Sequence, residues 1–150
     1  METLKIQCIP DELGRLAPLP EYQTEGAAAM DLRAFLAEPL TLAPMERQSV
    51  PTGLAVELPQ GFAGLVMARS GLATRSGLAL VNGVGLIDSD YRGEIRCGLI
   101  NLSAEPFTIR DGDRVAQLLL VPFARAELLP CESLSPTARG QGGFGSTGLK

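Results

Sequence analysis

The amino-acid sequence predicts an all-β fold, either a sandwich or a barrel of short strands. Short apolar or alternating segments recur along the chain, and turn residues separate them. The 17 glycines and 11 prolines among 150 residues leave little room for long helices. Many short strands with such punctuation are typical of antiparallel sandwiches and barrels. The length predicts one domain that buries roughly 68–70% of the surface of the unfolded chain.

The expected strands follow one another closely along the chain. They are Leu4–Ile9, Met30–Phe35, Ser49–Leu58, Phe62–Ala68, Leu78–Val81, Gly85–Ile87, Ile95–Leu102, Phe107–Ile109, Val115–Phe123 and Ala126–Leu128. Asn82-Gly83 predicts a type I′ hairpin turn, in which both central residues need a positive φ. One short helix is expected over Leu72–Arg75, with Ser70 as its N-cap because serine is a preferred capping residue.

The C-terminal segment differs in composition from the rest of the chain. Arg139–Gly148 is rich in glycine and has no hydrophobic periodicity. We therefore expect a β-barrel domain over residues 1–134 and a flexible arm over residues 135–150. The arm could be a disordered terminus or an RGG-like RNA-binding segment. Phe144 between glycines, with Arg139 before it, is instead typical of an arm that folds over a ligand.

Charge and residue content argue against several classes of function. The formal net charge of −4 is unlike that of a nucleic-acid-binding domain, which has a basic face. The chain has no histidine, so any catalytic proton transfer must use Asp, Glu, Lys, Tyr or a thiol. Cys8, Cys97 and Cys131 form no metal or redox motif, which predicts reduced thiols in the cytoplasm. We expect no membrane segment, because no apolar run approaches 18 residues.

The segment Asn82–Ile95 has the highest density of candidate functional residues. It joins a turn dipeptide, an apolar strand and Asp88, which stands where the chain must turn again. A carboxylate at the end of a rigid strand can act as a general base, although an aspartate there more commonly caps the turn. A second feature is that Arg69–Ala73 recurs as Arg75–Ala79. The two copies are six residues apart, which is too short for a structural repeat.

Five segments resemble, in order, the sequence motifs of the trimeric dUTPases. They are Ala27–Ala34, Ala68–Ala73, Asn82–Ile95, Arg110–Gln117 and Arg139–Gly148. Pro51–Leu54, between the first two, is also typical of that family. Ala29 and Ala68 stand where the family usually has glycine and proline. Neither position supplies a side chain to the chemistry, so we expect an altered backbone detail rather than lost activity.

The resemblance implies a jelly-roll-like β-barrel with one short helix, and a homotrimer whose sites are shared between subunits. It implies hydrolysis of dUTP to dUMP and pyrophosphate, which supports dTMP synthesis and keeps uracil out of DNA. The expected cofactor, Mg²⁺, would be held by the substrate phosphates, with contact through water to Gln117 or Asp31. A dCTP deaminase or a bifunctional relative on the same fold is an alternative, as is a catalytically silent β-trimer.

The third motif implies the nucleoside contacts. Asp88 is the expected base, which deprotonates the water that attacks the α-phosphorus. Tyr91 is expected to lie against the deoxyribose and to exclude a 2′-hydroxyl; its alternative is a half-exposed strand tyrosine. The uracil edge is expected to meet the backbone of Gly85, Leu86, Ile87 and Arg96 and the side-chain amide of Asn82.

The second and fourth motifs imply the phosphate contacts. Arg69, Ser70 and Gly71 are the expected ligands, because this copy of the repeat, and not the copy at Arg75, lies at the family-like distance from the third motif. The alternative is a helix cap beside a surface arginine. Gln117 is expected to reach the phosphates or a water on Mg²⁺.

Further roles follow from the first, fourth and fifth motifs. Asp31 is expected to hold an arginine in place, whereas Asp113 and Arg114 are expected to form structural ion pairs. Arg139 is expected to meet the γ-phosphate, and Phe144 to cover the uracil. The aromatic stacking would be worth about 1–3 kcal/mol, which offsets part of the cost of ordering the arm.

Overall fold

The computed structural model describes residues 2–143, and ten strands and one helix lie in that range. The elements are β1 (Lys5–Cys8), β2 (Met30–Arg33), β3 (Leu40–Leu42), β4 (Arg47–Glu57), β5 (Phe62–Ala68), α1 (Ser70–Ser76), β6 (Leu78–Leu80), β7 (Val84–Ile87), β8 (Glu94–Asn101), β9 (Phe107–Ile109) and β10 (Arg114–Pro122). The prediction of an all-β fold with a short helix is confirmed.

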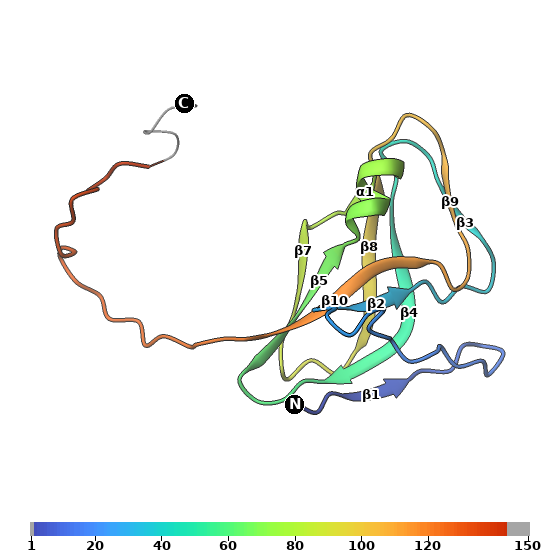
Figure 1. Ribbon diagram of the computed structural model, residues 1–150, viewed down its shortest axis with the longest axis horizontal. Helices are drawn as coiled ribbons and strands as arrows, with labels where there is room; N and C mark the ends of the chain where they lie inside the picture. The colour runs from blue at the N-terminus through green and yellow to red at the C-terminus, as the bar shows by residue number, and fades with distance from the viewer. Residues whose placement is uncertain (1, 144–150) are drawn as a thin grey trace.

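The strands form two four-stranded antiparallel sheets and a small ribbon. One sheet has the order β1-β4-β8-β6 and the other the order β2-β10-β5-β7, while β3 pairs with β9. Helix α1 and the β3–β9 ribbon lie toward the same end of the body (Figure 1). Strands distant in sequence therefore lie side by side, and α1 connects β5 of one sheet to β6 of the other.

The core lies between the two four-stranded sheets. Alternate residues of β8 face inward, so Ile95, Cys97 and Leu99 are buried while the residues between them are more exposed. Leu32 and Leu118 come from the opposite sheet and are fully buried. This alternation of inward apolar side chains is what the predicted strand periodicity requires.

Strand β4 contains a β-bulge opposite the start of β8. Pro51 pairs with Arg96, but the next pair is Ala55 with Glu94, so β4 has two more residues than β8 in this interval. Gly53, in the bulge, has a φ of 67°, a value that favours glycine. Side chains replace the missing ladder bonds: the Glu94 carboxylate accepts the Gly53 N–H at 2.8 Å. The bulge thus anchors Glu94.

Three local predictions were wrong. Strand β3 was missed, and residues 126–128 form no strand in the single chain. The N-cap of α1 is Arg69 rather than Ser70, and no side-chain hydrogen bond caps the helix. Ser70 has helical geometry, so its hydroxyl is not placed to cap the helix as an N-cap serine would be.

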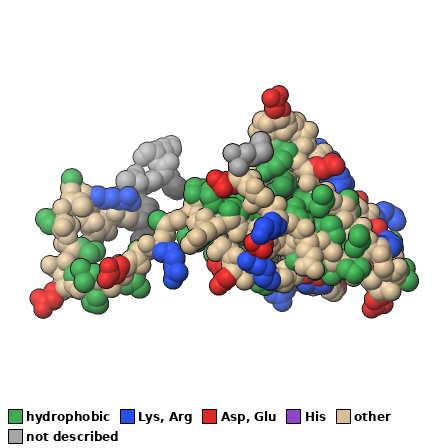
Figure 2. All heavy atoms as spheres, turned by 90° about the horizontal axis from the view of Figure 1, so that it is seen from below, with side chains coloured by type: hydrophobic (Ala, Val, Ile, Leu, Met, Phe, Trp, Pro, Cys, Tyr) green, Lys and Arg blue, Asp and Glu red, His purple; other side chains and the backbone are tan. Residues whose placement is uncertain are grey.

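Residues 123–143 leave the body as an extended segment (Figure 1). Nearly every residue in this range is exposed, and Leu128, Leu129 and Leu134 are at least 85% exposed. The space-filling view shows hydrophobic side chains along this projecting segment (Figure 2). Within residues 2–143, no helix is long and apolar enough to cross a membrane.

Candidate active site

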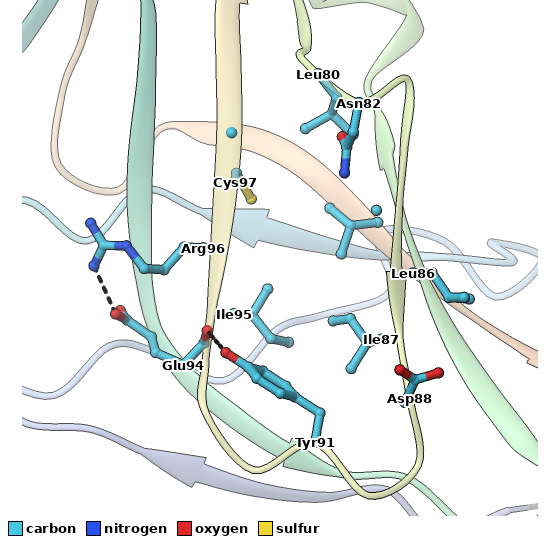
Figure 3. A pocket seen from close by; sticks show the side chains of 13 residues that line it. Leu80, Asn82, Leu86, Ile87, Asp88, Tyr91, Glu94, Ile95, Arg96 and Cys97 are labelled. Carbon is cyan, nitrogen blue, oxygen red and sulfur yellow. Dashed lines mark hydrogen bonds and ion pairs between the residues drawn. The ribbon is translucent and has the colours of Figure 1, made fainter.

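A pocket of about 290 Å³ lies between β7 and β8 (Figure 3). It contains the residues of the third motif that were predicted to act at the nucleoside or as the base: Asn82, Gly85, Leu86, Ile87, Asp88, Tyr91 and Arg96. The side chains of Ile87 and Ile95 point into the space between the strands, whereas Leu86 points away from β8 (Figure 3). Leu86 therefore presents its backbone to the pocket.

The pocket is flanked by two strand edges that are not paired with each other. Strand β7 pairs with β5 from Gly64↔Ile87 to Met67↔Val84. Strand β8 pairs with β4 on one edge, while β6 pairs with its other edge only from Leu99 to Asn101. Among the described residues, no ladder joins β7 to β8. Backbone N–H and C=O groups of facing edges are strong donors and acceptors. A planar heterocycle with both kinds of group can bind where a strand would pair.

The predicted type I′ hairpin at Asn82-Gly83 is wrong. Gly83 has a φ of 71°, but Asn82 does not have the positive φ that this turn needs. The flanking strands belong to different sheets, because β6 pairs with β8 and β7 pairs with β5. The turn instead carries the chain from one sheet to the other, and it leaves the Asn82 amide pointing into the pocket (Figure 3).

Asp88 and Tyr91 lie in the loop that connects β7 to β8. Asp88 directly follows β7, and its carbonyl accepts the Tyr91 N–H at 3.2 Å. The Asp88 carboxylate is exposed at the rim of the pocket. The Tyr91 hydroxyl donates to the carbonyl of Glu94 at 3.0 Å, so the ring lies across the loop (Figure 3). A carboxylate and a flat aromatic surface therefore line the same end of the pocket.

The inner wall of the pocket is apolar and contains one thiol. Cys97 is buried, and burial raises the pKa of its thiol to about 12. It is therefore protonated near neutral pH and is not a nucleophile. Arg96 faces the other way: its guanidinium contacts Ser49 of β4, with Nη2 3.0 Å from the Ser49 carbonyl. Only its backbone is left for the pocket.

A second cluster of predicted residues centres on the buried carboxylate of Asp31. Its Oδ1 lies 3.0 Å from Nε of Arg69, and its Oδ2 lies 3.1 Å from Nη1 of Arg114. Arg69 also donates to the carbonyl of Arg114 at 3.1 Å. The expected ion pair of Arg114 is present. For Asp113 the described residues contain no ion pair, since its carboxylate instead accepts the backbone N–H of Arg110 at 2.7 Å.

Gln117, Ser70 and Gly71 lie beside this cluster. Gln117 stands between Asp31 and Met67 in the sheet, and its Nε2 donates to the carbonyl of Ala68 at 3.1 Å. Ser70 and Gly71 open α1 directly after Arg69. The Arg69 guanidinium, the start of α1 at Ser70 and the Gln117 amide therefore lie at the end of β5.

The two clusters lie at opposite ends of the β5–β7 pair. Gly64 pairs with Ile87, and Ala68 ends β5 four residues later. Arg69 and Asp88 each extend one residue farther in opposite directions. At ~3.3 Å per strand residue these six steps amount to roughly 20 Å. The backbone positions of Arg69 and Asp88 are therefore far apart within one chain.

The predicted residues of the arm are only partly described. Arg139 is exposed, and its Nε donates to the carbonyl of Gly142 at 2.6 Å within a local turn. It contacts neither cluster in the single chain. Phe144 lies outside the described residues, so its expected place over the uracil stays a prediction.

Sequence reasoning missed the supporting residues Gly93, Glu94 and Thr52. Tyr91 lies over Gly93, Glu94 holds both the Tyr91 hydroxyl and the β4 bulge, and Thr52 donates to the carbonyl of Ile95 at 2.6 Å. The glycine two residues after Tyr91 was a visible signal. Glu94 and Thr52 lie in the family-like segments Asn82–Ile95 and Pro51–Leu54, but their roles could not be assigned because they depend on a bulge between strands that are distant in sequence.

The chain is similar to known proteins over nearly its whole length. The family model dUTPase matches residues 15–148. The chain belongs to the dUTPase family. It is 53% identical to the deoxyuridine 5'-triphosphate nucleotidohydrolase of Anaeromyxobacter sp. (strain Fw109-5), over 97% of each chain. It is 49% identical to the protein of the same name from Desulfitobacterium hafniense (strain DSM 10664 / DCB-2), over 99% of each.

Solved structures of dUTPases share its fold. The dUTPase of Staphylococcus bacteriophage 80alpha with dUPNHPP superimposes with a TM-score of 0.87 at 27% identity, covering 99% of this chain and 100% of that one. The dUTPase of phage phi11 of S. aureus, described with a structural Mg(II) ion, gives a TM-score of 0.76 at 27% identity, covering 87% and 97%. The described part of the present dUTPase contains no group of three or more Cys, Asp and Glu residues arranged to hold a metal ion.

Proposed function

We propose that this chain hydrolyses dUTP to dUMP and pyrophosphate, with Asp88 as the general base. The pocket between the unpaired edges of β7 and β8, with the Asp88 carboxylate at its rim, carries this proposal. Asp88 orients a water and takes its proton as the oxygen attacks the α-phosphorus, and pyrophosphate leaves. Such transfers depend mainly on positioning and on stabilisation of charge. The curated relatives with the nucleotidohydrolase name support the same reaction.

Base selectivity follows from the fixed backbone of the pocket. Uracil presents one N–H between two carbonyls, and the edge groups of residues 85–87 and 96–98 can pair with that pattern, aided by the Asn82 amide. Cytosine replaces a carbonyl by an amine and leaves buried groups unpaired, a discrimination of about 10⁴ or more in favourable sites. The methyl group of thymine would meet the apolar wall near Ile95.

Selectivity for the sugar is assigned to Tyr91. Its ring is fixed at the pocket by the hydrogen bond to Glu94. A deoxyribose can lie against the ring, whereas a 2′-hydroxyl would occupy the same space. The chain should therefore reject UTP.

The phosphate contacts are assigned to a second copy of the chain. The roughly 20 Å between Asp88 and Arg69 along one β5–β7 pair supports a site that joins Asp88 of one copy to Arg69, Ser70, Gly71 and Gln117 of another. The outer face of the β2-β10-β5-β7 sheet supports the same assembly. It carries the cross-strand row Leu119, Leu65 and Leu86 and the adjacent pair Met67 and Val84.

A homotrimer would bury this apolar face and the exposed leucines of residues 123–143. Val84 is 50% exposed and Leu86 is 66% exposed in the single chain, and a contiguous apolar face of this kind is typical of an interface. The arm, from residue 135, then reaches a neighbouring site, where Arg139 meets the γ-phosphate and Phe144 covers the base.

Mg²⁺ would be held mainly by the substrate phosphates, as expected for a cation that keeps several waters. Both oxygens of Asp31 already contact arginines, so Asp31 is poorly suited to reach the ion. Gln117 fits better, because its amide nitrogen is bound to Ala68 and no hydrogen bond to its oxygen is found among the described residues. The ion would supply charge neutralisation on the phosphates. The free cysteines of the described chain support a reducing compartment such as the cytoplasm.

The proposal is tested by measuring pyrophosphate release with Mg²⁺ from dUTP, dCTP, dTTP and UTP at equal concentration. Release from dUTP alone is expected. Ammonia from dCTP would replace the proposal by a deaminase, and dUTP binding without turnover would indicate a silent relative.

A further inference from the structure

The ring of Tyr91 lies directly against the backbone of Gly93. A Cβ atom built on Gly93 would approach Cζ of Tyr91 to 2.6 Å and Cε2 to 3.0 Å. Gly93 does not have a left-handed φ, so its backbone conformation does not require glycine. What position 93 requires is the absence of a side chain, because the Tyr91 ring occupies that space.

The other end of Tyr91 is fixed through Glu94. The Tyr91 hydroxyl donates to the Glu94 carbonyl at 3.0 Å. The Glu94 side chain is fixed in turn: Oε1 accepts the N–H of Gly53 at 2.8 Å, and Oε2 lies 2.9 Å from Nη1 of Arg96 (Figure 3). Gly53 belongs to the β4 bulge, where the residue count opposite β8 allows this contact. The position of the tyrosine is therefore set by the barrel and not by the exposed loop alone.

We infer that Gly93 and Glu94 are positioning residues that set the discrimination between 2′-deoxy and 2′-hydroxy nucleotides. The inference rests on the proposed function and extends it. A steric wall rejects a hydroxyl only while it cannot move by the size of one oxygen atom. Tyr91 is 46% exposed and gains little rigidity from burial, so its two contacts supply the rigidity. Neither residue needs to touch the substrate through its side chain for this effect.

The first test is Gly93→Ala, compared with Gly26→Ala. An added Cβ at Gly26 meets nothing within 4 Å, and Gly26 also lacks a left-handed φ. For Gly93→Ala we expect the ratio of kcat/KM for dUTP over UTP to fall at least tenfold, mainly through KM. For Gly26→Ala we expect no change in the ratio. An unchanged ratio in a folded Gly93→Ala protein would overturn the inference.

Glu94 gives a second pair of variants that leave the loop glycine intact. Glu94→Leu removes the acceptor of the Gly53 N–H, whereas Glu94→Gln keeps an oxygen there. We expect the dUTP/UTP ratio to fall severalfold with leucine and to return toward the unaltered value with glutamine. Equal ratios in both variants would contradict a role for the Gly53 contact.

The position of Tyr91 can also be read without substrate. The chain has two tyrosines and no tryptophan, so Tyr91 is the only tyrosine in a Tyr22→Phe background. Acrylamide quenching of its fluorescence should increase with Gly93→Ala, and unchanged quenching would contradict displacement of the ring. If the unaltered chain fails to hydrolyse dUTP, the proposed function is wrong and the inference falls with it. If that chain is selective for dUTP but Gly93→Ala remains equally selective, the inference alone is wrong.

Discussion

The Asp31 carboxylate reaches Arg69 across an intervening strand. Asp31 lies on β2, β10 separates β2 from β5, and Arg69 follows β5, yet Oδ1 of Asp31 and Nε of Arg69 are 3.0 Å apart. The Asp31 side chain is 8% exposed and that of Arg69 is 28% exposed, so the contact is largely shielded from water. A long arginine held in this way presents its remaining N–H groups in a fixed direction.

Asp31→Asn should therefore raise KM for dUTP more than it lowers kcat. The variant loses the charge that holds Arg69 and Arg114, and we expect the free energy of unfolding to fall by about 1–3 kcal/mol. Glu57→Gln, which breaks the exposed Lys5–Glu57 ion pair, is the control and should be close to neutral. Steady-state kinetics and urea unfolding of both variants measure the effects. A KM unchanged in Asp31→Asn would refute the holding role.

Gly53 allows a test of the β4 bulge. In Gly53→Ala the new Cβ would lie 2.6 Å from Cδ1 of Phe35 and 2.9 Å from Cβ of Ala17, at a φ of 67°. In Gly14→Ala the φ is similar, 75°, but nothing lies within 4 Å. Left-handed strain alone costs about 1–2 kcal/mol, and overpacking adds about 1–3 kcal/mol. Thermal unfolding should thus show a larger loss of stability for Gly53→Ala than for Gly14→Ala. Equal losses of stability would mean that Gly53 is not packed against Phe35 and Ala17 as described.

Cys97 predicts a loss of stability at alkaline pH. Burial raises the pKa of its thiol from 9.0 to about 12, so the folded state keeps the proton that the unfolded state releases. Below pH 9 the contribution is fully present; between about pH 9 and 12 the free energy of unfolding should fall by about 1.4 kcal/mol per pH unit. Cys97→Ala should lack this component. The free energy of unfolding of both proteins can be measured by denaturant titration from pH 8 to 11. If it falls equally steeply with pH in both, the buried Cys97 thiol is not the cause.

Asp88 and Arg69 provide a test of the shared site. Asp88→Asn should lower kcat by about 10²–10⁴ without loss of stability, because the side chain is exposed and replaceable. Arg69→Ala should also hydrolyse dUTP more slowly than the unaltered chain. If one site joins Asp88 of one copy to Arg69 of another, unfolding and refolding the two variants together should restore part of the activity. No recovery in a mixture that forms trimers by analytical ultracentrifugation would mean that the sites are not shared in this way.

Removal of residues 139–150 tests the closing arm. The truncated chain should lose most turnover but keep its thermal unfolding temperature, since Arg139 is exposed and its hydrogen bond to Gly142 stays within a local turn. Full activity in this truncation would refute the role of Arg139 and Phe144.

The parts of the molecule that sequence reasoning predicted are those with a local signal. The alternation along β8 and the apolar run of β10 located these strands, and the motif order located the pocket residues and Asp31. The failures depend on contacts between distant segments. Asn82-Gly83 is a strong hairpin signal locally, but the pairing of β6 with β8 and of β7 with β5 overrides it. Strand β3 is only three residues long and depends on β9 as its partner.

The residues that hold Tyr91 show the same limit. Gly93 is visible as a glycine after a tyrosine, yet the reason for it lies in the position of the ring. Glu94 acts through Gly53, which is 41 residues earlier in the chain. A contact between residues so far apart in the sequence leaves no periodic pattern from which it could be predicted. Likewise, the distance between Asp88 and Arg69 appears only once the register of β5 and β7 is known.

Hydrolysis of dUTP in ¹⁸O-labelled water, followed by mass spectrometry of both products, tests the central claim most directly. Attack of a water held by Asp88 on the α-phosphorus predicts that the label enters dUMP and that the pyrophosphate stays unlabelled. Label in the pyrophosphate would place the attack on the β-phosphorus, and absence of dUMP would contradict the proposed reaction itself.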